Sequence, residues 1–264
     1  MIRRIALLAD IHANLVALDA VLEDIAEGGL RETYCLGDLV GYGPDPSGVI
    51  DRVRALELVT VQGNYDEGIG NRRGQCGCYY ADERARRDGA ASYAFTDHEV
   101  DDEHAAWLAA LPPALRFEER GVRVLLAHGS PRKVNEYLLP DRPAGLLARL
   151  AVAADADVVC VGHVHIPYHR ALAGPNGTIH YVSAGSVGMP KDGDPRACWV
   201  ELLIGDADDV EAAMSGDAPA VTAGDTDVHV SINIHRVEYN VEGVELAMRR
   251  AGLPASLAAT LRSA

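Results

Sequence analysis

Apolar and polar residues follow two different periods along the first 62 residues of the chain. Short apolar runs, which predict buried strands, lie at residues 4–9, 33–36 and 59–62. Between the first two runs, leucine and isoleucine recur at helical spacing after Asn14, a good N-cap residue, and Gly28 ends the pattern. A second helix is expected over residues 47–56. This strand–helix alternation predicts a parallel sheet with right-handed crossovers.

The pattern changes between residues 67 and 115, which are polar and rich in arginine and aspartate. Only residues 103–111 show clear helical periodicity there, and Pro112 and Pro113 close the stretch. We interpret residues 67–115 as a partly helical insert that lies over the edge of the sheet.

Strands and helices resume after the insert. Strands are expected at residues 122–127, 157–161, 196–204 and from 228 onwards, and helices at 143–153 and 241–250. A hairpin is expected over residues 168–182, around the turn residues 175–177. The acidic segment 206–225 is expected to be an exposed loop with a short helix. Because no internal repeat or linker interrupts residues 1–264, we predict a single domain of α/β class.

The composition restricts the class of protein. Acidic residues outnumber basic ones by 39 to 24, which gives a net charge of −15 and disfavours general nucleic-acid binding. A small phosphorylated substrate remains compatible with this charge, because bound divalent cations reverse the local field. No apolar run approaches the roughly 18 residues of a membrane span, and the first residues do not resemble a signal peptide. The five scattered cysteines therefore predict reduced thiols in a cytoplasmic protein.

Five short motifs place polar side chains at the ends of apolar runs. They are Asp10-Ile11-His12, Gly37-Asp38, Gly63-Asn64, His128-Gly129 and Gly162-His163-Val164-His165. Because the carboxyl ends of parallel strands converge at one edge of a sheet, these side chains can meet although they are distant in sequence. Each motif alone is usually a turn or a surface feature, but all five in order make coincidence a remote explanation.

The side chains of these motifs suit divalent metal ions, whose ligands are carboxylate, amide and imidazole groups. Asp10 and His12 are two residues apart, so they should project to the same side of an extended strand, and the same holds for the two histidines of the last motif. Asp38 has two oxygens with which to bridge two ions. Two ions roughly 3.5–4 Å apart can generate a hydroxide and clamp the oxygens of a phosphoryl group.

These motifs resemble those of the calcineurin-like metallophosphoesterases, and residues 185–188 and 192–196 are similar to the small bacterial and archaeal phosphodiesterase branch. The resemblance implies a four-layer α/β/β/α sandwich with mixed sheets. It also implies two sets of metal ligands that share one aspartate. The first set is Asp10, His12, Asp38 and His165, and the second is Asp38, Asn64, His128 and His163. Two divalent ions are expected, manganese first, with iron, zinc, nickel or cobalt as alternatives.

One position departs from the family pattern, because Gly-Asn-His-Asp becomes Gly63-Asn64-Tyr65-Asp66 here. In the family that histidine helps to protonate the leaving group or to stabilise the transition state, and the aspartate orients it. Tyrosine, with an ordinary pKa of about 10, is a poorer acid. Either Tyr65 donates a hydrogen bond only, or another histidine replaces it, or the leaving group needs no acid. An aryl ester or a nucleoside polyphosphate anhydride would fit the last alternative.

Loops near the motifs supply candidate substrate-binding residues. Tyr42, in a Gly-Tyr-Gly-Pro turn, could stack on a base or bind a phosphate, although a turn alone would explain these residues. Arg132 follows His128 and could clamp a phosphate through its guanidinium, or lie solvated. Cys76 and Cys78 are interpreted as loop residues, because they lack the second pair that a zinc site needs.

The sequence thus predicts a dinuclear metal-dependent phosphoesterase, in which a metal-bridging hydroxide attacks small phosphodiesters or nucleoside polyphosphates, such as dinucleoside tetraphosphates or cyclic nucleotides. The predicted catalytic residues are Asp38, Asn64, Tyr65 and His128, and the predicted substrate-binding residues are Asn64, Tyr42 and Arg132. The alternatives are a phosphomonoesterase, a nuclease for DNA ends, and a non-catalytic scaffold or sensor of the same fold, as in one retromer subunit. The alternating strand that begins at Val228 could pair with another chain, which leaves a homo-oligomer open.

Overall fold

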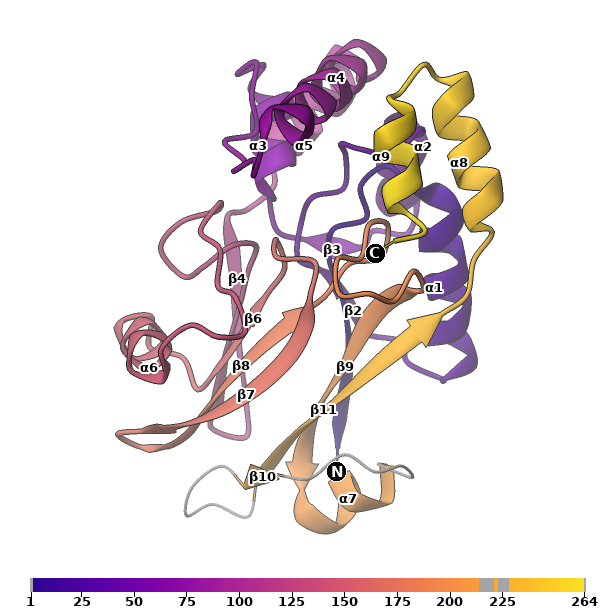
Figure 1. Ribbon diagram of the computed structural model, residues 1–264. Coiled ribbons are helices and arrows are strands. Elements are labelled where there is room, and N and C mark those ends of the chain that lie inside the picture. The colour runs from indigo at the N-terminus through magenta and orange to yellow at the C-terminus, as the bar shows by residue number, and fades with distance from the viewer. Residues whose placement is uncertain (1, 214–220, 223–227, 264) are drawn as a thin grey trace.

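The computed structural model describes residues 2–213, 221–222 and 228–263, and it contains two mixed β-sheets that face each other (Figure 1). The first sheet has the strand order β10-β11-β9-β1-β2-β3. Its strands are β1 (Arg3–Leu8), β2 (Thr33–Cys35), β3 (Val59–Thr60), β9 (Ala197–Asp206), β10 (Val221–Thr222) and β11 (Val228–Val237). The first three strands are parallel, as the strand–helix alternation predicts, and β9 and β11 are antiparallel additions.

The second sheet has the order β4-β5-β6-β8-β7. Its strands are β4 (Ala114–Glu119), β5 (Val122–Ala127), β6 (Val158–Val161), β7 (Pro167–Gly174) and β8 (Gly177–Ala184). Strands β5, β6 and β8 are parallel, so their carboxyl ends lie at one edge. The predicted hairpin is β7 and β8, whereas β4 was not predicted, because its exposed and half-buried residues lack a clean alternation.

Alternating side chains of the strands separate four layers. In β1, Ile5 and Leu7 join the core between the two sheets, whereas Ala6 and Leu8 face the helices on the outer side. Residues of β6 divide in the same way between the inter-sheet core and a helix on the other outer side. The covering helices are α1 (Leu15–Glu27), α2 (Pro46–Ala55) and α6 (Ala144–Ala153). The fold is therefore the expected α/β/β/α sandwich (Figure 1).

Residues 64–109, most of which lie in the predicted insert, form three helices above the carboxyl ends of the strands (Figure 1). They are α3 (Asn64–Gly70), α4 (Glu83–Glu99) and α5 (Asp102–Ala109). Only α5 corresponds to the periodicity predicted over residues 103–111. The longest helix, α4, was not predicted, because its buried side consists of Gly89, Ser92, Tyr93 and Thr96 rather than an apolar stripe.

The carboxyl-terminal segment adds α8 (Val241–Arg250), which was predicted, and α9 (Ala255–Thr260), which was too short to be recognised. These two helices share a small core with Met189 of the loop between β8 and β9. Of the predicted acidic segment, α7 (Ala207–Ala213) and β10 are described, and residues 214–220 and 223–225 lie outside the described residues. Strand β11 pairs with β9 along its whole length but with β10 through only two residues.

One prediction about the cysteines is wrong. Cys76 and Cys78 form a disulfide, whereas the other three cysteines are free and buried. Gly77 between them has a φ of 67°, a left-handed conformation that reverses the chain and brings the two Cα atoms to 5.4 Å. Among the described residues, no helix is long and apolar enough to cross a membrane.

Candidate metal centre

The seven side chains of the five motifs converge at the carboxyl edge of both sheets. They follow β1, β2, β5 and β6, or begin α3, and their loops are joined by backbone hydrogen bonds such as His12 N to Asp38 O (3.0 Å) and Gly162 N to His128 O (2.8 Å). None of the seven is more than 4% exposed. The members are Asp10, His12, Asp38, Asn64, His128, His163 and His165.

The sequence predicts an extended backbone at Asp10 and His12, but the structure shows that the backbone there is not extended. Strand β1 ends at Leu8, and Asp10 and His12 have φ values of 53° and 49° in the left-handed region. His163 and His165 have the same conformation after β6. These paired residues share a side because the loops curl, which costs about 1–3 kcal/mol per strained residue and must be held by the surrounding structure.

Glycines next to the ligands permit close approach of the loops. Gly37 has a φ of 88°, which agrees with the tight turn expected before Asp38. A Cβ at Gly63 would lie 2.1 Å from the backbone nitrogen of Asp38. The glycines of the Gly-Asp and Gly-Asn motifs therefore let α3 begin directly against the Asp38 loop.

Three histidines are oriented by backbone carbonyl groups. The Nδ1 atoms of His12, His128 and His165 lie 2.9, 2.7 and 2.6 Å from the carbonyl oxygens of Val40, Leu36 and Met189. A carbonyl oxygen can only accept a hydrogen bond, so each Nδ1 must carry the proton and donate. In the neutral imidazole the Nε2 lone pair then points into the site, which is how metal-binding histidines are held.

The first group of facing atoms comes from Asp10, His12 and His165. The two Nε2 atoms are 3.1 Å apart, and they lie 3.7 and 3.4 Å from Asp10 Oδ1. Asp10 Oδ1 has no hydrogen-bond partner among the described residues. Lone pairs and a carboxylate oxygen that face one another repel unless a cation lies between them, so these residues fit a metal ion.

The second group comes from Asp38, His128 and His163, with Asn64 beside them. His128 Nε2 lies 3.3 Å from Asp38 Oδ2 and 3.1 Å from Asn64 Oδ1, both of which are acceptors. His163 Nε2 is buried without a hydrogen-bond partner in the described part of the chain. Asp38 Oδ2 is also 3.8 Å from His12 Nε2, which places this carboxylate between the two groups. The nitrogen and oxygen donors suit manganese, iron, zinc, nickel or cobalt.

Burial and neighbouring charges shift the pKa values of several side chains at this site. Burial, with a smaller contribution from the charge of Asp38, raises the pKa of Asp10 to about 8. Burial also lowers the pKa of His12 to about 4 and that of His163 to about 3, so both imidazoles are neutral at pH 7. Against its own burial, the pKa of His128 rises to about 9 because Asp38 is so close. A proton on His128 thus offsets part of the negative charge.

Asp66 holds the Asp38 loop rather than a histidine. Its carboxylate accepts hydrogen bonds from three backbone N–H groups, those of Asp38 (2.8 Å), Leu39 (2.9 Å) and Gly63 (2.9 Å). In return, Asp38 Oδ1 accepts a hydrogen bond from the backbone N–H of Tyr65 (2.8 Å). The sequence left the role of Asp66 open, although an acidic residue three positions after Gly63 is a capping signal for α3.

Tyr65 and Tyr42 pack next to the first group of facing atoms. The ring of Tyr42 lies 4.7 Å from that of His12, centroid to centroid, and the ring of Tyr65 lies 5.5 Å from it. Tyr65 is fully buried in the core beneath α1 and α2, and burial raises its pKa well above the ordinary value of 10.0. Arg132 is not brought into this cluster, because its exposed guanidinium pairs with Glu136 (2.8 Å).

Lys191 is a neighbour of the site that the sequence did not indicate. Its backbone N–H donates to the carbonyl of His165 (3.1 Å), and its ammonium lies 5.8 Å from the centroid of the Tyr42 ring. The residue is exposed at the mouth of the site, yet the protein atoms around its ammonium lower its pKa, against the opposing influence of Asp10 and Asp38. Its only sequence signal was its place three residues after Gly188 in the 185–188 motif.

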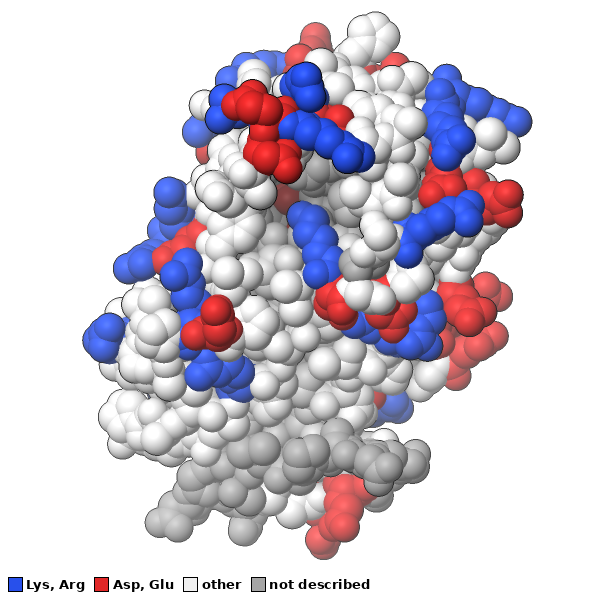
Figure 2. Space-filling view, viewed as in Figure 1, with Lys and Arg blue, Asp and Glu red and all other residues white. Residues whose placement is uncertain are grey.

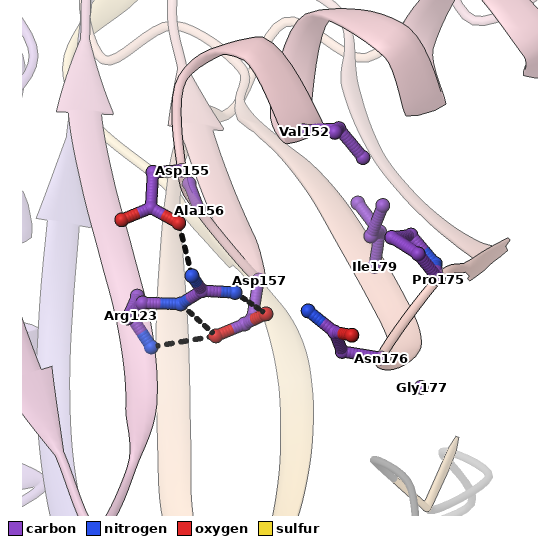
Figure 3. Close-up of a pocket in the computed structure, with 9 residues that line it drawn as sticks. All are labelled: Arg123, Val152, Asp155, Ala156, Asp157, Pro175, Asn176, Gly177 and Ile179. Atoms are coloured by element: carbon purple, nitrogen blue, oxygen red, sulfur yellow. Dashed lines mark hydrogen bonds and ion pairs between the residues drawn. The ribbon is translucent and has the colours of Figure 1, made fainter.

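A small hollow lies at the other end of the second sheet from the candidate metal centre (Figure 3). It measures about 50 Å³ and is bordered by Arg123, near the start of β5. The guanidinium of Arg123 is bound by Asp155 and by both oxygens of Asp157 (2.9 and 2.7 Å). These charges are paired, which favours a structural role over a binding site.

Known proteins resemble this chain over most of its length. Residues 4–209 match the model of the calcineurin-like phosphoesterase superfamily domain. Protein MJ0912 of Methanocaldococcus jannaschii is 31% identical over 74% of this chain and 80% of its own, and phosphodiesterase YfcE of Escherichia coli K12 is 25% identical over 72% and 82%. The crystal structure of a metallophosphoesterase from Sphaerobacter thermophilus matches with a TM-score of 0.70 and 30% identity, covering 99% of each chain.

Proposed function

Because the chain belongs to the calcineurin-like phosphoesterase superfamily, we propose that it is a dinuclear metal-dependent phosphoesterase for small phosphodiesters or nucleoside polyphosphates. The observation that carries this proposal is the pair of histidine Nε2 atoms of His12 and His165, 3.1 Å apart, with both Nδ1 protons committed to carbonyl groups. Such an arrangement is unfavourable without a cation, and the protein nevertheless buries it completely.

In this proposal, one ion is held by the first group and a second ion by the second group, and Asp38 contributes to both. The first ion would take Asp10, His12, Asp38 and His165, and the second would take Asp38, Asn64, His128 and His163. When bound, two such ions supply the positive charge that activates water and neutralises phosphoryl oxygens.

The chain itself supplies orientation and the exclusion of water. Asp66 fixes the loop of Asp38, and Asn64 is fixed by donating from Nδ2 to the carbonyl of Cys76 (3.1 Å) and to Cys78 Sγ (3.2 Å). Its Oδ1 is thereby turned toward His128. Side chains that are held in this way need no rearrangement when the reaction begins, which is the main source of electrostatic stabilisation in enzymes.

The preference for small diesters or anhydrides follows from the chemistry of Tyr65. A buried phenol with a raised pKa is a weaker acid than the imidazolium that the family has at this position, so Tyr65 is a poor general acid. Substrates that need no acid have good leaving groups, such as an aryl ester or the anhydride of a nucleoside polyphosphate. The similarity to phosphodiesterase YfcE supports the diester alternative.

The test is hydrolysis of bis(p-nitrophenyl) phosphate by the manganese-loaded protein at alkaline pH. We expect turnover and two metal ions per chain by elemental analysis. Asp38→Ala should abolish both, whereas Asp141→Ala, which changes an exposed aspartate, should leave both intact. Two bound ions without turnover of any phosphate ester would point to a scaffold or sensor. Full activity of Asp38→Ala would reject the bridging role.

A further inference from the structure

A large cavity opens beside the metal centre. It has a volume of about 620 Å³, within the range of small-molecule binding sites. One wall is the segment 79–89, which includes the first turns of α4, and the opposite wall is α9 with residues up to 263. Residues 189–191 of the loop between β8 and β9, together with Tyr42, complete the lining. Figure 1 shows α9 standing beside α4 above the carboxyl ends of the strands.

Tyr42 and Lys191 connect this cavity to the metal centre. The Tyr42 ring lines the cavity and also contacts the ring of His12 at 4.7 Å between centroids. Lys191 lines the cavity with its ammonium near the Tyr42 ring, and it interacts electrostatically with Asp10 and Asp38. The inner end of the cavity is therefore the edge of the metal centre, and a phosphoryl group placed on the centre would leave the rest of its ester in the cavity.

The walls differ in their chemistry. Tyr79 and Tyr80 supply aromatic surface on one side, and Tyr79 is 75% exposed, so its ring is free to cover a ligand. Ser256 and Thr260 on α9 supply hydroxyl groups on the other side. Aromatic surface opposite hydroxyl groups matches a ligand that has both a planar ring system and sugar hydroxyls.

Lys191 is suited to the phosphate of such a ligand. The chain is strongly acidic, yet within the described residues no carboxylate forms an ion pair with Lys191. The other basic side chain of the cavity, Arg84, lies 4.0 Å from Asp88. Acidic and basic side chains are interspersed over this face of the molecule (Figure 2), so an unpaired cation at the inner end of the cavity is a local feature.

We propose that this cavity binds the nucleoside part of a phosphate ester or anhydride, and that Lys191 contacts the phosphoryl group between the nucleoside and the metal centre. The proposal rests on the proposed function for the reaction itself. Helix α9 follows residue 209, where the match to the family domain ends, so this wall lies outside the matched domain.

The first experiment measures binding by calorimetry with three probes. The manganese-loaded protein is titrated with adenosine 5′-monophosphate, with ribose 5-phosphate and with adenosine. Stacking of a base on an aromatic side chain strengthens binding by about tenfold or more, so adenosine 5′-monophosphate should bind at least that much more tightly than ribose 5-phosphate. Equal affinities for these two phosphates would overturn the proposal.

The second experiment fills the cavity from either wall. Ala85→Trp and Thr260→Trp change residues that line it, whereas Ala90→Trp and Ala259→Trp place the same side chain on the same helices outside it. The first two variants should lose the preference for adenosine 5′-monophosphate and keep their affinity for ribose 5-phosphate. The two control variants should keep the preference. If all four behaved alike, the cavity would not be the subsite.

The third experiment removes the charge of Lys191. The chain has only two lysines, so Lys133→Gln is a matched control for Lys191→Gln. Lys191→Gln should weaken binding of both phosphates by about tenfold and leave the affinity for adenosine unchanged. Loss of adenosine binding as well would mean that Lys191 shapes the cavity rather than contacts phosphate, which would contradict its proposed role.

These experiments separate failure of the subsite from failure of the proposed function. Adenosine binding that disappears in Ala85→Trp, together with no hydrolysis of any phosphate ester, would retain the subsite and refute the enzyme. Hydrolysis of bis(p-nitrophenyl) phosphate together with equal binding of the two sugar phosphates would retain the enzyme and refute the subsite.

Discussion

Charged and polar side chains cluster at both ends of strands β5 and β6. The two clusters differ in whether these side chains have hydrogen-bond or ion-pair partners. At the amino end, Arg123 is bound by Asp155 and Asp157, and the nearby hollow is small (Figure 3). At the carboxyl end, by contrast, Asp10 Oδ1 and His163 Nε2 are buried and have no hydrogen-bond partner among the described residues. Buried polar atoms without partners, rather than charge or a hollow alone, distinguish the candidate site from the structural cluster.

The physical reason for this difference is the cost of removing polar groups from water. The side chains of Arg123 and Asp157 keep 34% and 24% of their exposure, so their ion pairs cost little and contribute modestly. The candidate ligands at the other end are almost completely buried, where an unpaired polar group costs several kcal/mol. A fold that maintains such a cluster with only partial internal compensation fits a ligand that supplies the missing charge.

The largest effect that would sharpen this comparison is expected from Asp66→Asn. This substitution leaves all seven proposed ligands in place and removes one of the two oxygens that hold the Asp38 loop. Loss of such a supporting group typically lowers metal affinity or activity about 10–100-fold. We expect a decrease of this size in both, measured by metal titration and by hydrolysis of bis(p-nitrophenyl) phosphate.

Glu67→Gln is the matched control, because Glu67 is the neighbouring acid in the first turn of α3 and pairs with Arg73 at the surface. It should leave metal affinity and activity unchanged. If Asp66→Asn had no more effect than Glu67→Gln, the Asp38 loop would not depend on Asp66, and the arrangement of the site would have another cause.

Sequence could predict the candidate ligands because most of them follow the ends of strands. Apolar runs of four to six residues mark β1, β5 and β6, and the polar residue after each run is placed by the topology of the sheet. It could not predict the local backbone, because the left-handed residues Asp10 and His12 depend on hydrogen bonds to the neighbouring loop after β2, such as His12 N to Asp38 O.

The rest of the molecule was less predictable because its contacts are irregular. Helix α4 packs through Gly89 and Ser92, which carry no hydrophobic periodicity. Lys191 is brought to the centre by the carbonyl of His165, a contact between residues 26 positions apart that no motif records. The disulfide of Cys76 depends on the turn at Gly77 rather than on a spacing pattern.

A smaller effect, confined to stability, is expected from Arg123→Met at the amino end. The bidentate contact with Asp157 is partly exposed, so its loss should lower the free energy of unfolding by about 1 kcal/mol. Activity of the metal-loaded protein should stay the same, because the metal centre lies at the other end of β5. Thermal unfolding, together with turnover of bis(p-nitrophenyl) phosphate, measures both. A loss of activity would break the separation between the two ends.

The stabilisation that Arg123→Met removes should depend on pH. The hydrogen bond from Arg123 lowers the pKa of Asp157 below its ordinary value of 3.8. A carboxyl group whose pKa is lowered by folding contributes stability above its unfolded pKa and loses it as the pH falls through the folded pKa. The difference in the free energy of unfolding between the variant and the original protein should therefore be constant near pH 7, decrease as the pH falls below 3.8, and disappear once the pH is below the lowered pKa of Asp157.

The smallest effect is expected from Tyr65→Phe. This substitution tests whether a buried hydroxyl group next to the candidate metal ligands takes part in the reaction. Tyr65 is buried and polar, and its ring packs against His12 and Tyr42. Within the described part of the chain, its one hydrogen bond to a proposed ligand comes from its backbone N–H. Phenylalanine keeps the ring and the backbone N–H. Because the phenol is a weak acid and p-nitrophenolate is a good leaving group, kcat for bis(p-nitrophenyl) phosphate should change by less than about twofold. A decrease in kcat of tenfold or more would show that the hydroxyl group contacts the substrate. Burial of a polar side chain in the core would then not be enough to exclude it from the reaction.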